Sequence, residues 1–400
     1  MNRRQFLAIS CGATRVLATL GFLTSCRRGG SASGGHADTP VSFRSNIGGL
    51  SALQPADANG IRLPIGFESR VVARSGQLVE ASGYTWHAAP DGGATFAAMD
   101  GGWVYVSNSE INDAGGVGAL RFDATGRLVD AYPILERSTR NCAGGSTTWG
   151  TWLSCEEVRM GLVWECDPFG RNLPKAREAL GLFTHEAAAV DPASQFIYLT
   201  EDLPDGRLYR FRPGSFTSGG VPDLTTGTLE VAQIHNAETG SVTWMELPDH
   251  LGSMIATRHQ RPESTPFNGG EGIAYHDRSF YFTTKGDNRI WRYWVPEQRI
   301  SIVYDAAESS DPILTGTDNI LVSPFGEVLV AEDGGDMQVV AVMPNGLLLP
   351  VLQVEGHANS EVTGIAFSPD MSRLYFSSQR GEVGTSASGI TYEVRGPFRI

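Results

Sequence analysis

Residues 196–202 read Phe196-Ile197-Tyr198-Leu199-Thr200-Glu201-Asp202, a run of aromatic and branched apolar residues that ends on two acids. Alternation of this kind, entered from a turn and closed by polar residues, is typical of a half-buried β-strand. Most copies of the pattern are followed by a second alternating strand, as in 206–211 and 288–293. The same pattern returns in five further segments: 102–110, 150–157, 280–285, 328–333 and 374–379.

The spacing of these segments predicts the architecture. Their starts lie about 45 to 48 residues apart, except for one interval of about 84 residues between the third and the fourth. A period in the forties with several short strands per unit indicates a β-propeller. We therefore expect an all-β chain forming a six-bladed β-propeller, with an insertion of about 40 residues near 213–266 that carries strands of its own at 228–234 and 241–247. A seventh, degenerate blade in the long interval is the alternative.

Composition agrees with this fold and excludes some partners. The chain has 400 residues, 48 of them Gly, and its formal net charge is −13. High glycine suits an all-β protein with many turns. The negative charge argues against nucleic-acid binding and allows a cation-binding surface. We expect a monomer.

The N-terminus predicts export. Arg3-Arg4 precedes a weakly apolar stretch at 7–25 that is too short and too polar for a stable membrane span, which is typical of a twin-arginine signal. We expect residues 1–26 to be this signal, read by the twin-arginine translocase, 27–60 to be a flexible tether, and 61–400 to be the propeller domain. Leu23-Thr24-Ser25-Cys26 is similar to a lipobox, so lipidated Cys26 would tether the protein to a membrane. Cleavage without lipidation stays open, and either route gives a periplasmic or cell-surface protein.

The remaining cysteines are odd in number. Cys11 leaves with the signal and Cys26 is acylated, so three cysteines stay in the body of the chain: Cys142, Cys155 and Cys166. In an oxidising compartment at least one of them has no internal disulfide partner. A bridge between Cys155 and Cys166 is conceivable, which leaves Cys142 to be explained.

Acidic residues recur at blade-equivalent spacing. Fifteen residues separate Cys142 from Glu157, and the same offset recurs between Glu186 and Glu201 and between Asp318 and Asp333. The strand that opens each unit of a propeller usually lines the channel, so four residues should converge there: Cys142, Glu186, Glu271 and Asp318. Neighbouring strand ends would add Glu110, Glu157, Glu201 or Asp202, and Glu332 or Asp333. Carboxylates gathered in this way repel one another unless metal lies between them. Oxygen ligands suit Ca²⁺, and a thiolate beside carboxylates suggests iron.

Several of these motifs resemble a known family. Residues 141–157, with Cys142 near the start and Glu157 at the end, resemble the long signature of the PhoX-type alkaline phosphatases. Further similar segments are 185–192, 198–202, 271–272, 318–319 and 332–333, and the likeness runs from about residue 86 to the C-terminus. The resemblance implies a six-bladed, twin-arginine-exported propeller with Fe³⁺ and Ca²⁺ clustered in its channel. It implies that the iron ions and the catalytic centre are held by Cys142, Glu157, Glu186 and Glu271. It implies metal roles, mainly toward calcium, for Glu110, Glu201, Asp318, Asn319, Glu332 and Asp333.

The chemistry implied is hydrolysis of a small phosphorylated substrate, a phosphomonoester, with diesters left open. Several cations facing one pocket neutralise phosphate oxygens and position a nucleophile. One departure from the family is Gly269, which stands where relatives usually have an arginine; the candidate substitutes are Arg258, Arg261 and Lys285. Two alternatives remain at this stage: a calcium-dependent lactonase or esterase on a propeller, and a non-catalytic surface binding propeller. Metal content would separate them, because only the phosphatase needs iron.

Overall fold

The computed structural model describes residues 43–400, apart from residues 81, 236–237 and 311. Across that span the regular structure is almost entirely β-strand, with four short 3₁₀ turns: η1 (Ile47–Gly49), η2 (Glu178–Leu180), η3 (Thr257–His259) and η4 (Ser386–Ser388). No helix in this part of the chain has the length and apolar character that crossing a membrane requires. The expected export signal, Cys26 and the start of the tether lie outside the described residues.

The strands form five antiparallel sheets, two of which are simple four-stranded meanders. The first meander contains β3 (Pro90–Ala97), β4 (Trp103–Ser109), β5 (Gly115–Phe122) and β6 (Leu128–Ser138). The second contains β7 (Asn141–Ser146), β8 (Trp152–Glu156), β9 (Val163–Cys166) and β10 (Lys175–Ala176). In both, consecutive strands are hydrogen-bonded neighbours, as the repeat pattern predicts.

Two further sheets combine the C-terminal repeats with strands from the N-terminal side. One contains β20 (Thr317–Val322), β21 (Val328–Glu332), β22 (Gln338–Val342), β23 (Leu348–Val354) and, at its outer edge, β1 (Ile61–Arg62). The other contains β24 (Val362–Phe367), β25 (Arg373–Ser378), β26 (Ile390–Arg395) and β2 (Glu68–Arg74). Because β2 pairs with β26 along its length, the two ends of the described chain are fastened into one sheet.

The fifth sheet has nine strands and contains the long interval between repeats. Its members are β11 (His185–Val190), β12 (Ile197–Glu201), β13 (Leu208–Pro213), β14 (Gly227–Ile234), β15 (Gly240–Glu246), β16 (Gly270–His276), β17 (Ser279–Thr284), β18 (Arg289–Trp294) and β19 (Arg299–Asp305). The strands expected at 228–234 and 241–247 are β14 and β15. β15 pairs with β14 over five residue pairs and with β19 over two, so the interval extends an existing sheet and adds no separate seventh blade within the described residues.

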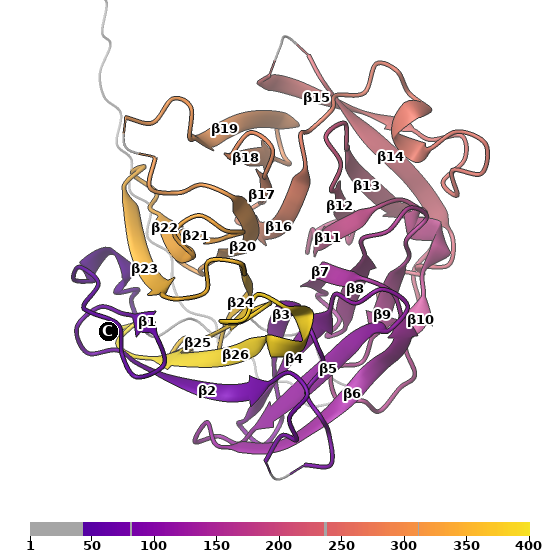
Figure 1. Ribbon diagram of the computed structural model, residues 1–400. Helices are drawn as coiled ribbons and strands as arrows, with labels where there is room; N and C mark the ends of the chain where they lie inside the picture. The colour runs from indigo at the N-terminus through magenta and orange to yellow at the C-terminus, as the bar shows by residue number, and fades with distance from the viewer. Residues whose placement is uncertain (1–42, 81, 236–237, 311) are drawn as a thin grey trace, which may run out of the picture. The chain divides into compact units, whose positions relative to one another are not determined.

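The first strand of each repeat faces a common centre. β3, β7, β11, β16, β20 and β24 contact one another in that order, and β24 returns to β3. Figure 1 shows the remaining strands of each repeat running outward from this centre. The six quoted segments supply β4, β8, β12, β17, β21 and β25, the second strands of the repeats. The prediction of an all-β, propeller-like arrangement is therefore confirmed.

The apolar core lies between neighbouring sheets. Between the β3–β6 sheet and the sheet of β24, β25, β26 and β2, Tyr105 and Tyr375 stack with ring centroids 5.1 Å apart. The expected tether needs correction from residue 43 onward, since Ile47 is fully buried in the core and Arg44 is hydrogen-bonded through its backbone to Ile400. Burial of Ile47 removes this part of the segment from solvent and ties it to the sheets.

Candidate metal centre

All six central strands share one irregularity, a β-bulge at the end where the second strand of the repeat finishes. The register shifts between Asn141 and Gly144 in β7, and at the matching point in β3, β11, β16, β20 and β24. A bulge turns the side chain of its extra residue out of the normal alternation, which is why bulges are common beside functional sites. The residues that directly follow the outer strand pair at the six bulges are Asp91, Cys142, Glu186, Glu271, Asp318 and Thr363, which we call the bulge ring.

A second set of side chains comes from the ends of the second strands. The residue after each inner strand pair occupies an equivalent place in all six repeats. These residues are Glu110, Glu157, Asp202, Lys285, Asp333 and Gln379, which we call the strand-end ring. The bulge-ring carboxylates are buried, whereas Asp202, Lys285 and Asp333 have side chains that are 23%, 35% and 28% exposed. These three members of the strand-end ring thus lie on the solvent side of the bulge ring, whereas Gln379 is buried.

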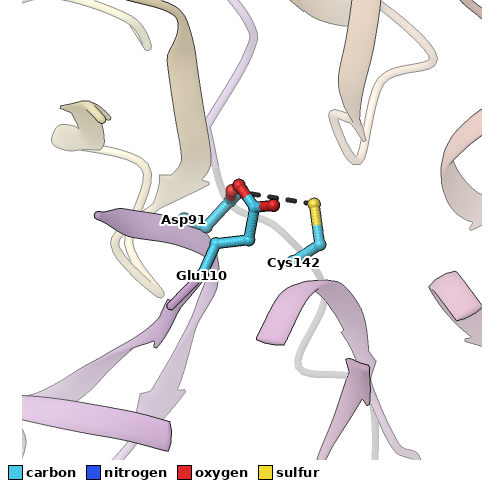
Figure 2. A group of neighbouring side chains, drawn as sticks. All are labelled: Asp91, Glu110 and Cys142. Atoms are coloured by element: carbon cyan, nitrogen blue, oxygen red, sulfur yellow. Dashed lines mark hydrogen bonds between the residues drawn. The ribbon is translucent and has the colours of Figure 1, made fainter. Parts of the chain in front are cut away.

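The thiol of Cys142 lies among carboxylates. Its Sγ is 3.3 Å from Oε1 of Glu186 and 3.6 Å from Oδ2 of Asp91. Figure 2 shows Asp91, Glu110 and Cys142 pointing toward one another, with the thiol directed at the Asp91 carboxylate. Gln379 donates from its side-chain amide to Asp91 at 2.6 Å and to Glu110 at 2.7 Å, and so holds these two acids side by side.

Ligand-type atoms form four overlapping groups, in each of which one atom per residue lies within 4.8 Å of the others. The groups are Asp91–Glu110–Cys142, Cys142–Glu157–Glu186, Glu186–Glu271–Asp318 and Asp318–Asp333–Glu361. Each group shares a residue with the next. The structure therefore brings seven of the ten sequence-predicted site residues into one continuous cluster: Glu110, Cys142, Glu157, Glu186, Glu271, Asp318 and Asp333.

Glu201 and Glu332 do not belong to this cluster, which corrects the sequence-based expectation. Oε2 of Glu201 accepts hydrogen bonds from the backbone N–H of Arg207 and the hydroxyl of Tyr209, and Oε2 of Glu332 accepts one from the backbone N–H of Gln338. Glu156 bonds the N–H of residue 162 in the same way, six residues on. Glu156, Glu201 and Glu332 therefore stabilise the loops that follow their strands, and their side chains face away from the centre.

A single extra residue explains the error at Glu201. In the β7–β8 hairpin the last paired residues before the turn are Ser146 and Trp152, and in the β11–β12 hairpin they are Val190 and Ile197. The turn between β11 and β12 is therefore one residue longer than the turn between β7 and β8. Because side chains alternate along a strand, a shift of one residue moves a side chain to the opposite face. Glu201 therefore matches Glu156, and Asp202 takes the inward position that the fifteen-residue spacing had assigned to Glu201.

Asn319, the tenth predicted site residue, is a neighbour of the cluster. Its side-chain amide donates to Oδ1 of Asp318 at 3.0 Å, and its carbonyl oxygen accepts from the backbone N–H of Gly364. Sequence reasoning missed Asp91 and Glu361 altogether. Asp91 lies 110 − 91 = 19 residues before Glu110, since the first hairpin is longer than the others, and Glu361 precedes its bulge, so neither shows the fifteen-residue offset.

Burial and mutual repulsion control the protonation of the cluster in the metal-free chain. Burial, reinforced by Asp91 and Glu186, raises the pKa of the Cys142 thiol well above its usual range. Burial and the Glu110 carboxylate raise the pKa of Glu157 to about 7, and burial raises the pKa of Asp318 to about 6. The pKa values of Asp91, Glu186, Glu271 and Glu361 are raised as well, first by burial and then by neighbouring acids. The ionised forms of such groups are energetically unfavourable unless a cation lies between them.

Three basic side chains border the cluster, here called the mouth cations. Arg140 pairs with Glu110 at 2.5 Å and with Glu157, Lys285 pairs with Glu271 at 2.8 Å, and Arg380 pairs with Glu361 at 2.8 Å. Neither of the other candidate cations joins them. Arg258 pairs with Glu201 and Asp205, and Arg261 donates to a backbone carbonyl of β15.

Gly269 has a backbone conformation that disfavours a side chain. Its φ is +70°, and an added Cβ would lie 3.2 Å from Oδ1 of Asp202. Residues other than glycine are strained in the left-handed region. The site of the expected arginine is thus adapted to glycine in this chain. Cys155 and Cys166 are both free and buried, away from the cluster.

The fold and the cluster define a class: an all-β, propeller-like protein with a candidate metal centre where its central strands meet. A family model described as "Alkaline phosphatase PhoX" matches residues 113–161 and 158–381, well over half of the chain. The chain belongs to the PhoX alkaline phosphatase family and is a phosphatase; the family is metal-dependent. No curated protein matches the sequence.

Solved structures resemble the fold. A structure of Pseudomonas fluorescens PhoX in complex with vanadate, a transition state analogue, has a TM-score of 0.70 and 17% sequence identity, and the match covers 86% of this chain and 97% of that one. A Bacteroides thetaiotaomicron protein of unknown function has a TM-score of 0.49 and 9% identity, with 86% of this chain and 83% of that one covered. The first of these supports the propeller-like fold.

Proposed function

We propose that this phosphatase hydrolyses phosphomonoesters with a cluster of Fe³⁺ and Ca²⁺ ions held by the bulge ring and its neighbours. The observation that carries the proposal is the convergence of one thiol and eight carboxylates in four overlapping groups of metal-ligand size. Oε2 of Glu186 is buried and accepts no hydrogen bond from the described residues, so a ligand atom is directed at the centre without a protein partner. The residues present therefore fit a metal cluster.

The donor types divide the cluster. Cys142, with Glu157 and Glu186 around it, offers the softer end that suits iron. The carboxylate groups Glu186–Glu271–Asp318 and Asp318–Asp333–Glu361 contain oxygen donors alone, which is the ligand set of Ca²⁺. Metal ions bound there would supply positive charge that polarises the phosphoryl group and activates the attacking nucleophile.

The chain's own side chains position and restrain this chemistry. The bulges fix the five ligand residues of the bulge ring on strands rather than on loops, which favours precise geometry. Gln379 keeps Asp91 and Glu110 adjacent, and Asn319 holds Asp318. Burial of Glu186, Glu271 and Asp318 keeps bulk water from the ligands and strengthens every charge interaction there.

We further infer that the nine-stranded sheet is two blades, β11–β14 and β16–β19, linked at the rim by β15. Six central strands in a closed order support a count of six blades. We also propose that residues 1–26 direct twin-arginine export to the periplasm or cell surface, with Cys26 as a lipid anchor, and that the protein is a monomer without affinity for nucleic acid. Phosphodiesters remain a second substrate class to be tested.

Metal analysis joined to kinetics tests the proposal. The full chain is purified, its iron and calcium contents are measured, and hydrolysis of an aryl phosphate and of the corresponding bis-aryl phosphate is followed. We expect both metals, with monoester turnover lost together with iron in Cys142→Ala and retained in Cys166→Ala, a matched change at a buried cysteine outside the cluster. Calcium without iron would favour the lactonase or esterase alternative, and turnover by iron-free Cys142→Ala would refute the iron mechanism.

A further inference from the structure

Lys285 occupies a position that is acidic in most other repeats. Four of the six strand-end positions carry carboxylates, one carries Gln379, and the fourth repeat carries Lys285. Equivalent strand positions direct their side chains to the same space, so the ammonium group of Lys285 enters the ring that Glu157 and Asp333 also face. All six positions are among the described residues, and Lys285 is the one cation among them.

The contacts of Lys285 join three repeats. Its Nζ lies 2.8 Å from Oε1 of Glu271, 3.4 Å from Oδ2 of Asp333 and 3.9 Å from Oδ2 of Asp202. Glu271 is in β16, whereas Asp202 and Asp333 follow β12 and β21. A single ammonium therefore offsets acids that belong to the candidate metal centre and its rim. When bound metal cations neutralise those acids, the positive charge of the ammonium is no longer offset and can attract another anion.

Exposure places Lys285 on the path of an entering anion. Its side chain is 35% exposed, whereas that of Glu271 beneath it is 2% exposed. The ammonium thus lies between the buried ligands and solvent. A phosphate group that approaches the buried centre from this side meets Lys285 before it meets any residue of the bulge ring.

Lys285 is also the mouth cation with the most freedom to turn toward a ligand. Arg380 is tied by its guanidinium to Glu361 at 2.8 Å, to the Gln379 side chain at 2.7 Å and to the Asn359 carbonyl at 3.0 Å. Arg140 is held between Glu110 and Glu157. A lysine has a flexible four-carbon stem and three rotatable donors, so its head can move from a carboxylate to a phosphate oxygen.

We propose that Lys285 binds the phosphate group of the substrate directly and so sets the affinity of this enzyme for phosphomonoesters. The proposal rests on the function proposed above. It makes Lys285 a substrate-binding residue and distinguishes it from a residue that only neutralises the metal ligands.

Chemical labelling tests the contact without measuring catalysis. The chain contains two lysines, Lys285 and Lys175, and Lys175 is exposed on β10. The metal-loaded full chain is acetylated with and without inorganic phosphate, and both lysine peptides are quantified by mass spectrometry. We expect phosphate to slow acetylation of Lys285 at least fivefold and to leave Lys175 unchanged. Equal acetylation of Lys285 with and without phosphate would overturn the proposal.

Kinetics of matched variants separate substrate binding from metal binding. Charge-assisted hydrogen bonds to phosphate predict that Lys285→Met raises the KM for an aryl phosphate, and the inhibition constant of inorganic phosphate, about tenfold or more, with a smaller change in kcat. Lys285→Arg should restore both constants to within about threefold of the wild type, and Lys175→Met should change neither. Unchanged constants in Lys285→Met, or loss of metal from it, would overturn the proposal. A wild-type protein that hydrolyses no phosphomonoester would instead refute the proposed function, and the labelling result would still decide whether Lys285 binds phosphate.

Discussion

Replacing Glu201 and Asp202 one at a time tests whether a one-residue difference in hairpin length determines which acid faces the centre. The side chain of Glu201 is fully buried and accepts hydrogen bonds from the Arg207 N–H at 3.2 Å and the Tyr209 hydroxyl at 2.8 Å. It also pairs with Arg258 at 3.3 Å. Glu201→Ala leaves the buried Arg207 N–H without an acceptor, at about 1–3 kcal/mol, and also removes the ion pair with Arg258 and one of the two partners of the Tyr209 hydroxyl, which keeps Thr257 at 3.0 Å. We expect a loss of about 3 kcal/mol with no change in metal content.

The expected decrease in the free energy of unfolding is large enough to be measured as a change in Tm. A domain of this length has an unfolding entropy of about 0.75 kcal/mol/K, from about 2.1 cal/mol/K per residue. A loss of about 3 kcal/mol should therefore lower the Tm by about 4 °C, which differential scanning fluorimetry resolves. The control is Asp202→Asn, which changes a partly exposed side chain and should shift the Tm by less than about 1 °C. The reasoning is refuted if Glu201→Ala loses metal at an unchanged Tm, or if Asp202→Asn is the variant that is destabilised.

The remaining predictions concern the ligands, the glycine and pH. Cys142→Ser should lower the iron content several-fold because a hydroxyl is a harder and less acidic donor, as measured by elemental analysis; full iron occupancy would contradict this. Gly269→Arg should lower the Tm by about 1–3 °C, since a left-handed residue other than glycine costs about 1–2 kcal/mol, and a raised Tm would show that the strain argument is wrong. In chelator-treated protein the pKa values of Glu157 (about 7) and Asp318 (about 6) lie above their unfolded values of 4.5 and 3.8, so the folded state holds more protons across about pH 4–7. Stability should then fall as pH rises through that window, and a metal-free Tm that is flat or rises from pH 5 to 8 would contradict it.

Much of the fold could be predicted because one strand pattern recurs. The six segments correspond to β4, β8, β12, β17, β21 and β25, and alternation with turn residues is a local signal that needs no knowledge of the partner strand. Pairing between strands that are distant in the sequence could not be predicted in this way. β1, β2 and β15 pair with strands far away in the sequence or across a long interval, and such pairing leaves no periodic trace in the chain.

The candidate site could be predicted where the repeat length is constant. Cys142, Glu186, Glu271 and Asp318 occupy equivalent bulges, and equal spacing identified Glu157 and Asp333 as their partners. Asp91 was missed because its hairpin is longer than the others. Glu201 was chosen over Asp202 because the fifteen-residue spacing takes no account of the one residue added to the turn between β11 and β12. Lys285 was considered only as a replacement for an arginine, although its place among the strand-end positions follows from the same register.

The pairing of β2 with β26 has a consequence for synthesis. Residues 68–74 find their partner only when residues 390–395 have left the ribosome, about 320 residues later. At about 5–20 residues per second this takes on the order of 20–60 s. Throughout that time an open strand edge is available to other chains, and such edges promote aggregation. We therefore expect a nascent chain of this protein to be most prone to aggregation before β26 pairs with β2 and closes the circle of sheets.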